Sequence, residues 1–273
     1  MDLDGNKFQG FFFNGLLNGE GSIDYANGVH EEGLFADNVL NGKGKRVRSN
    51  SVEEGSFVKG RLVSGSMQLP DGTLIEAQEI DGTSFRGKGR VVLANGVIQE
   101  GNFEANKLNG FGKSVTQNYT DEGMFVDGLL SGQGSRTAVS GLRHEGTFVA
   151  GMMSFGKITY PDGSVYEGPV QNNKKVGDGV YTYAVDGSKY VGAFANDKPN
   201  GHGVLTFADG TIVEGNFSDG DVSGEAVIQY PNGIVYRGPV VSRRLRHGTG
   251  TVTSADGKTS VSATFDHDKT VVK

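Results

Sequence analysis

Short hydrophobic runs of β-type residues alternate with polar turn pairs along the whole chain. The runs include Val91–Leu93, Val180–Tyr183 and Val204–Phe207, and no stretch has the 3.6-residue apolar spacing of an amphipathic helix. Turn pairs such as Asp127-Gly128 and Asp162-Gly163 separate these runs. Asparagine or aspartate followed by glycine supplies the positive φ angles that two-residue hairpin turns need. The pattern therefore predicts an all-β chain of antiparallel hairpins.

These hairpins recur with a spacing of 22 to 25 residues. Most repeats contain an acidic or other polar residue, then a glycine that we call the anchor, then any residue, then an aromatic or aliphatic residue. The anchor glycines are Gly10, Gly33, Gly55, Gly101, Gly123, Gly146, Gly168, Gly192, Gly215 and Gly238. A Gly-x-Gly triplet follows most anchors after 9 and 11 residues, as Gly19 and Gly21 follow Gly10.

Eleven repeats and a terminal half repeat fill residues 1–273 and leave no residues for a separate catalytic domain. A single repeat buries too few large side chains to offset the entropy lost on ordering it, so only a stack of repeats is stable. We therefore predict one repeat array over residues 1–273, in which residues 1–150 are more diverged than residues 151–273.

Alternation along a strand assigns side chains to its two faces. The residues two before and two after an anchor share the face of the anchor, and the glutamate one before it projects to the opposite, wetter face. A glycine between two large residues leaves room for an aromatic ring from a neighbouring strand to lie over the backbone. The aromatic row predicted in this way, which is also the candidate partner-binding surface, consists of Tyr166, Tyr190, Phe194, Phe217 and Tyr236.

The composition excludes several classes of protein. The 273 residues include 45 glycines, which the repeats largely account for, and no cysteine, so disulfides, thiol nucleophiles and thiolate zinc sites are excluded. No apolar run approaches the 18 or so residues of a membrane helix. The acidic first residues give no sign of a secretory signal peptide. We therefore expect a cytoplasmic protein.

No constellation of residues predicts catalysis. Gly112-Lys113-Ser114 is similar to the end of a phosphate-binding loop, but Lys107 stands where that loop needs a glycine. The glutamates that precede the anchors recur one repeat apart, roughly 10 Å, which suits solvation of a face better than a shared acid–base task. The histidines lack the paired spacing of a zinc site: they are His30, His144, His202, His247 and His267. We predict no enzymatic activity and no catalytic, cofactor or metal site.

Two basic clusters are candidate contacts for an anionic partner. One is Lys43–Arg48, and the other contains Arg243, Arg244 and Arg246. Either could meet anionic lipid headgroups or an acidic protein surface. The net charge of −6 argues against nucleic acid and against a strongly membrane-directed surface. A protein partner is the favoured interpretation, and a peripheral membrane adaptor that binds phosphoinositides is the alternative.

The repeats resemble the MORN-repeat family, whose pattern is roughly Tyr-x-Gly-x-aromatic, then Gly-x-Gly, then Pro-Asp-Gly or Asn-Gly. Tyr160–Gly168 is the most similar stretch, followed by Gly187–Gly203. The early repeats depart from this pattern, since the position two before the anchor is not tyrosine, and the chain has no tryptophan. The residues at that position are Phe8, Glu31, Glu53, Ile75, Gln99, Asp121 and His144.

The resemblance implies an elongated, twisted, single-layer sheet of antiparallel hairpins that acts as a non-catalytic scaffold without a cofactor. It also implies protein partners in cytoskeletal or ciliary assemblies, lipid binding in some members, and the possibility of a homodimer. The segment Tyr183–Phe194 is similar to repeats of the radial spoke head proteins of the axoneme. We therefore expect a place in the cytoskeleton or in the axoneme of a cilium or flagellum.

Overall fold

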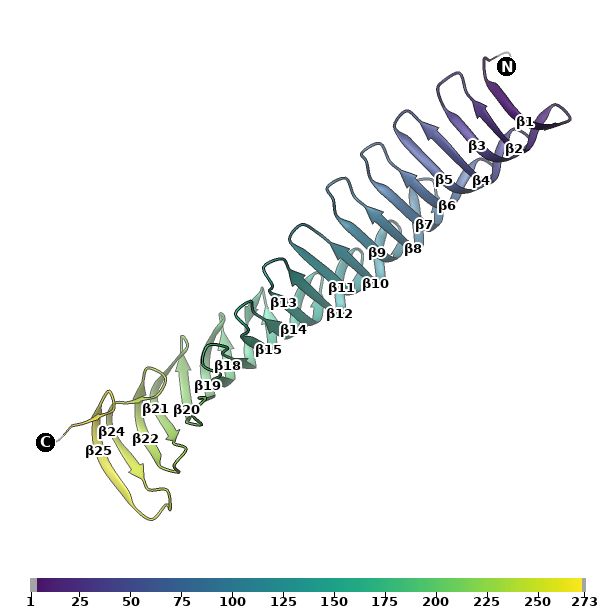
Figure 1. Ribbon diagram of the computed structural model, residues 1–273. Helices are drawn as coiled ribbons and strands as arrows, with labels where there is room; N and C mark the ends of the chain where they lie inside the picture. Colours follow the sequence, from purple (N-terminus) through teal and green to yellow (C-terminus); the bar gives the residue numbers. More distant parts are fainter. Residues whose placement is uncertain (1–3, 272–273) are drawn as a thin grey trace. The chain divides into compact units, whose positions relative to one another are not determined.

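The computed structural model describes residues 4–271 and contains no helix among them. Successive strands are antiparallel and joined by short turns (Figure 1), so the predicted all-β chain of hairpins is confirmed. The chain divides into two compact units, Met1–Gly134 and Ser135–Lys273. The boundary falls inside strand β12, Leu129–Ala138.

In the first unit every strand pairs with the next one along the chain, from β1 to β11. The strands are β1 (Lys7–Phe13), β2 (Leu16–Asp24), β3 (His30–Ala36), β4 (Val39–Arg48), β5 (Ser51–Val58), β6 (Arg61–Gln68), β7 (Leu74–Asp81), β8 (Ser84–Val92), β9 (Ile98–Glu104), β10 (Lys107–Val115) and β11 (Tyr119–Val126). All of the anchors of this unit lie in the odd-numbered strands.

The second unit repeats this arrangement, except that its second strands are interrupted at two places. The short pieces β16 and β23 pair with β15 and β22, and the longer pieces β17 and β24 pair with the same two strands. The strands are β13 (Arg143–Val149), β14 (Met152–Thr159), β15 (Val165–Gln171), β16 (Lys174–Lys175), β17 (Gly177–Thr182), β18 (Lys189–Ala195), β19 (Lys198–Thr206), β20 (Ile212–Ser218), β21 (Asp221–Gln229), β22 (Val235–Val241), β23 (Leu245–Arg246), β24 (Gly248–Thr253), β25 (Ser260–Asp266) and β26 (Lys269–Thr270).

Strand register places the anchors in a row that crosses each unit at right angles to its strands. We call this the glycine row. In the first unit it contains Gly10, Gly21, Gly33, Gly44, Gly55, Gly65, Ala77, Gly89, Gly101, Gly112 and Gly123. In the second unit, pairs such as Gly146 with Gly156 and Gly192 with Gly203 continue the same pattern.

Close approach between strands explains why these positions are glycine. A Cβ on Gly192 would lie 2.5 Å from the Cα of Gly203 and 2.6 Å from the carbonyl oxygen of His202. The φ angle of Gly192 is +155°, a value that residues with a side chain rarely adopt. A β-bulge follows between Gly192 and Phe194, and it accompanies the inward turn of the Phe194 ring, which is buried.

One large side chain covers each part of the glycine row on the core side, and its origin differs between the units. In the first unit it is the leucine seven residues after the anchor: Leu17 lies against both Gly10 and Gly21. In the second unit a tyrosine two residues before the anchor covers Gly168, Gly192 and Gly238. At Gly146 the arrangement of the first unit remains, since Met153, seven residues after this anchor, lies against Gly156.

The expectation that the ring over an anchor comes from a neighbouring strand is therefore wrong, because Tyr190 covers the anchor Gly192 of its own strand. The same ring also reaches Gly203 on the neighbouring strand β19.

At β3 to β5 glutamates replace the tyrosine, and their charges are paired. Glu31, which is buried, accepts hydrogen bonds from Nε of Arg46 and from the hydroxyl of Tyr25. Arg46 also pairs with Glu53 at 3.0 Å, and Arg48 pairs with the other oxygen of Glu53. Buried ions are costly unless they are paired and hydrogen-bonded. At β3 to β5 the divergence is therefore a matched exchange of an aromatic core for an ionic one.

Candidate protein-binding surface

The face opposite the core of the first unit carries a groove whose floor is the glycine row. A hollow of about 810 Å³ lies over strands β2 to β6. A second hollow shares Gly65 with it and extends the groove to β8. The residues that line the two hollows are Glu20, Gly21, Glu32, Gly33, Leu34, Lys43, Gly44, Lys45, Glu54, Gly55, Ser56, Ser64, Gly65, Glu76, Ala77, Gln78, Lys88, Gly89 and Arg90. Since the floor has almost no side chains, a partner can approach the backbone closely.

The walls of the groove carry charges of both signs. Glu32 and Lys45 are cross-strand neighbours, and Lys45 lies 4.0 Å from Glu54. The same pairing recurs farther along, where Arg90 lies 2.9 Å from Glu100. Exposed pairs of this kind contribute little to stability. Their regular alternation instead gives the wall a charge pattern that a polar partner can match, and it confirms that the glutamates before the anchors face solvent.

On β10 and β11 of the first unit an exposed apolar pair lies beside the cross-strand pair Lys113 and Glu122. Phe111 is 61% exposed and Met124 is 42% exposed, and the two are directly opposite each other in the strand register. They occupy the same repeat positions as Lys43 and Leu34, which line the groove. An exposed aromatic residue beside an exposed methionine is typical of a protein contact surface rather than of a solvated face.

The aromatic row predicted as the partner-binding surface is instead the core of the second unit. Tyr166, Tyr190, Phe194, Phe217 and Tyr236 have exposed fractions between 0% and 4%. The ring of Tyr190 lies edge-on to Phe194 at 5.2 Å and to Phe217 at 4.9 Å. Its hydroxyl donates to the carbonyl of Ala193 at 3.0 Å. Rings buried to this degree present no surface to a partner, which corrects the sequence-based assignment.

Burial also changes the ionisation of four tyrosines. It raises the pKa of each of them to about 12, with a further contribution from the Glu31 carboxylate at Tyr25 and from Asp197 at Tyr166. The other two are Tyr160 and Tyr190. Ionising any one of these phenols in the folded state would place a negative charge in an apolar or already anionic surrounding.

We expect the free energy of unfolding to fall as the pH rises from about 10 to about 12. Tyrosines in the unfolded chain lose their protons near pH 10. In the folded state these four tyrosines have pKa values of about 12 and keep their protons to higher pH. Between pH 10 and pH 12 the folded state therefore binds more protons than the unfolded state, and its stability falls as the pH rises. Below pH 10 both states hold the protons and the contribution is complete. Absorbance titration of phenolate, with and without denaturant, measures the effect; simultaneous ionisation of all nine tyrosines near pH 10 in the folded protein would contradict it.

All three arginines proposed to contact an anionic partner lie over aromatic rings of the second unit. The guanidinium of Arg243 lies 4.7 Å from the centre of the Tyr183 ring, and that of Arg244 lies 4.5 Å from the Phe207 ring. Arg244 also forms an ion pair with Asp209 at 2.7 Å. These contacts are cation–π interactions, and they hold both side chains against the protein surface.

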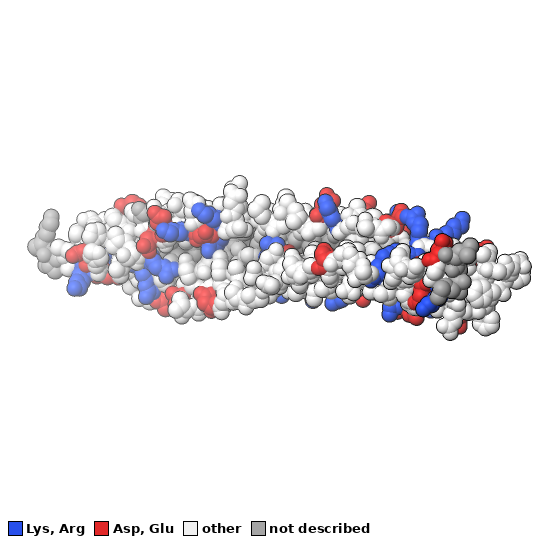
Figure 2. Space-filling view, turned by 90° about the horizontal axis from the view of Figure 1, so that it is seen from above, with Lys and Arg blue, Asp and Glu red and all other residues white. Residues whose placement is uncertain are grey.

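The third arginine and part of the other basic cluster also have partners within the protein. Arg246 lies over the ring of Phe265 at 4.2 Å and pairs with Asp268 at 2.7 Å. Within Lys43–Arg48, Arg46 belongs to the buried ionic core described above. Basic and acidic side chains lie interspersed on the face shown in Figure 2. This arrangement does not favour a membrane adaptor, which needs a basic surface free to meet anionic headgroups. Among the described residues there is also no helix long and apolar enough to span a bilayer.

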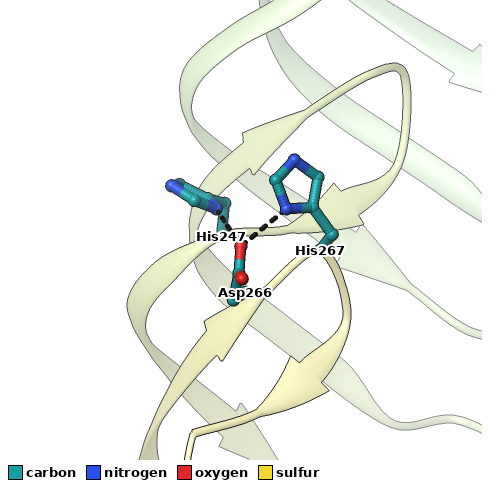
Figure 3. A group of neighbouring side chains, drawn as sticks. All are labelled: His247, Asp266 and His267. Atoms are coloured by element: carbon teal, nitrogen blue, oxygen red, sulfur yellow. Dashed lines mark hydrogen bonds and ion pairs between the residues drawn. The ribbon is translucent and has the colours of Figure 1, made fainter.

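One further cluster joins residues that looked unrelated in the sequence. His247, Asp266 and His267 lie together at the end of the second unit (Figure 3), with one ligand atom of each within 4.8 Å of the others. The sequence does not predict this group, because its two histidines are not a few residues apart, as the ligands of a zinc motif are. Antiparallel pairing of β24 with β25 brings the two histidines together across a hairpin.

The model of the MORN-repeat family matches eight segments of the chain. They are residues 8–30, 32–51, 100–120, 122–143, 144–165, 166–188, 190–212 and 245–259. The segments between 51 and 100 and between 212 and 245, where no match is found, contain the degenerate anchor Ala77 and the exchange of a row glycine for Ala226. No curated protein sequence matches the chain significantly.

Similar solved structures include the TCP domain of SAS-4 (dCPAP) of Drosophila melanogaster in complex with a proline-rich motif of Ana2 (dSTIL). It is 17% identical, with 52% of this chain and 85% of that chain covered and a TM-score of 0.30. A point mutant of the TCP10 domain of Danio rerio CPAP is 10% identical, with 97% of both chains covered and a TM-score of 0.17. BamB from Moraxella catarrhalis is 12% identical, with 82% and 94% covered and a TM-score of 0.13. TM-scores this low support no argument about function.

Proposed function

Because the chain belongs to the MORN-repeat family, we propose that it is a non-catalytic scaffold that binds an extended segment of another protein in the groove of its first unit. The groove itself carries this proposal. Its floor is bare backbone, and acidic and basic side chains alternate along its walls. Phe111 and Met124 add an exposed apolar pair at the repeat positions that Lys43 and Leu34 occupy in the groove. An extended segment fits such a surface because alternate side chains can contact the walls while its backbone lies close to the floor.

The repetition of the site argues for binding and against chemistry. A catalytic centre is one set of converging groups with perturbed acidity. Along the groove the same positions carry a glutamate and a lysine or arginine in turn, and these side chains are exposed and paired across strands. The groove therefore offers many weak, similar contacts to a long partner, which is how repeat proteins use their extended surfaces.

We place this scaffold in a cytoskeletal or ciliary assembly, and the similarity of Tyr183–Phe194 to radial spoke head repeats supports the axoneme in particular. A homodimer belongs to the same proposal, because an edge strand of a sheet such as β1 leaves backbone groups available for pairing with a second chain. Localisation of the tagged chain in ciliated cells tests the placement, and the mass of the chain in solution tests the dimer.

Proximity labelling in cells tests the groove. We expect a defined set of proteins to be lost from the labelled neighbours in the double variant Phe111→Ser and Met124→Ser, because this variant lacks the exposed apolar pair. Both side chains are exposed, so the fold should be unaffected. A matched control is Val185→Ser, which changes a side chain that is 92% exposed in a turn of the second unit.

The outcome separates the proposal from its alternatives. Loss of protein neighbours in the double variant, with retention in Val185→Ser, supports a protein-binding groove. An unchanged set of neighbours in both variants would overturn it. Neighbours that are chiefly membrane proteins, lost instead on replacing Arg243, Arg244 and Arg246 by alanine, would favour the membrane adaptor.

A further inference from the structure

We propose that His247, Asp266 and His267 form a binding site for a divalent transition-metal ion, Zn²⁺ in the first instance. The three side chains offer two imidazole nitrogens and one carboxylate oxygen, which is a ligand set that zinc accepts. All three are exposed, so an ion reaches them from solvent and water can complete its coordination. Figure 3 shows the carboxylate of Asp266 between the two imidazole rings.

The separations are already close to those of a metal site. Nδ1 of His267 lies 2.6 Å from Oδ1 of Asp266, and Nδ1 of His247 lies 3.5 Å from the same oxygen. The two ring centres are 5.1 Å apart. Ligand atoms at about 2.0–2.2 Å from a tetrahedral zinc ion are about 3.3 Å from one another. Small rotations of the side chains are therefore sufficient to bring all three donors onto one ion.

Backbone contacts hold the two histidines in this position. His267 and Asp268 form the turn between β25 and β26, where both have positive φ angles. Asp268 accepts hydrogen bonds from the backbone N–H of Arg246 at 3.0 Å and from its Nε at 2.7 Å, and donates its own N–H to the carbonyl of Arg246 at 3.0 Å. These bonds tie the turn to Arg246, the residue before His247. The site is consequently preorganised by bonds that do not involve its ligands.

The chemistry of the donors selects the class of ion. Imidazole nitrogen suits zinc, copper and nickel, whereas calcium and magnesium prefer sites made only of oxygen donors. A single carboxylate beside two imidazoles therefore points to a borderline transition metal. Because the ligands come from the β23–β24 link and from β25 with its following turn, a bound ion would connect the last hairpins of the unit.

Calorimetric titration of the full, tag-free chain with Zn²⁺ tests this site. We expect saturable binding of one ion per chain, accompanied by a higher temperature of unfolding. His247→Ala and His267→Ala should each raise the dissociation constant at least tenfold and abolish the thermal shift. Mg²⁺ should produce neither effect, because it lacks preference for imidazole.

His202→Ala provides the matched control, because His202 is an exposed histidine of the same unit that faces Glu214 at 3.7 Å and has no second histidine beside it. It should bind zinc like the unaltered chain. Circular dichroism of each apo variant checks that folding is unaffected. The proposal is overturned if the unaltered chain shows no saturable binding, or if zinc binds equally well to both His247→Ala and His267→Ala.

Discussion

Replacing Gly192 with valine should reduce the free energy of unfolding of the second unit by about 2–6 kcal/mol, as the sum of backbone strain and overpacking. A Cβ at this position would meet the Cα of Gly203 at 2.5 Å, the carbonyl of His202 at 2.6 Å and the hydroxyl of Tyr190 at 2.8 Å. Two of these groups are backbone and cannot move without breaking the pairing of β18 with β19. Denaturant unfolding followed by circular dichroism measures the loss.

Asn216→Val is the control for this substitution. Asn216 follows Gly215 on the exposed face of β20, where a β-branched side chain is well accommodated in a strand. We expect its stability to change by no more than about 0.5 kcal/mol, as for surface substitutions generally. Equal unfolding curves for Gly192→Val and the unaltered chain would refute the close approach of strands at the glycine row.

Replacing Tyr190 with alanine should cost about 3–5 kcal/mol, the range for removing a large buried aromatic side chain. The ring is fully buried, covers Gly192 and Gly203, and packs edge-on against Phe194 and Phe217. Its removal leaves a cavity over the glycine row, because glycines have no side chains with which to fill it. Thermal and denaturant unfolding of the full chain measure the change.

Two further variants separate the contributions of the tyrosine. Tyr190→Phe keeps the ring and deletes only the hydrogen bond to the carbonyl of Ala193, so it should cost about 0.5–1.5 kcal/mol. Adding Pro199→Leu to Tyr190→Ala should restore about 1–2 kcal/mol, because position 199 is where the leucines of the first unit cover their glycines. If Pro199→Leu were equally stabilising without Tyr190→Ala, the two side chains would not share one space.

The periodic features of the fold could be predicted from the sequence, because they depend on local chemistry. Turn pairs such as Asp162-Gly163 mark the hairpins, and alternation about the anchor assigns Glu32 and Glu54 to the exposed face, as the structure has them. The direction in which a side chain leans could not be predicted. Alternation places Tyr190 on the face of Gly192 but does not show that its ring covers this glycine of its own strand as well as Gly203 of the next strand.

The binding surface was harder to predict, since it depends on which side chains are left exposed after packing. Aromatic residues are typical of interfaces, yet Tyr166 and Tyr236 are needed for the core of a sheet whose central positions are glycine. Conversely, Phe111 occupies a Gly-x-Gly position that is usually polar in this chain, and only the register shows it facing out beside Met124. Pairs such as Arg46 with Glu31 lie 15 residues apart and need the register as well.

The two ways of covering the glycine row set a rule for exchanging repeats between proteins. A repeat with leucine at the later position, such as Leu17, and a repeat with tyrosine at the earlier position, such as Tyr190, each bring one covering side chain. A crossover inside a repeat could combine both side chains, which would overfill the space, or neither, which would leave a void. Functional recombinants and designed chimaeras should therefore be joined at the turns that end the repeats, where the covering side chain and its glycines are inherited together.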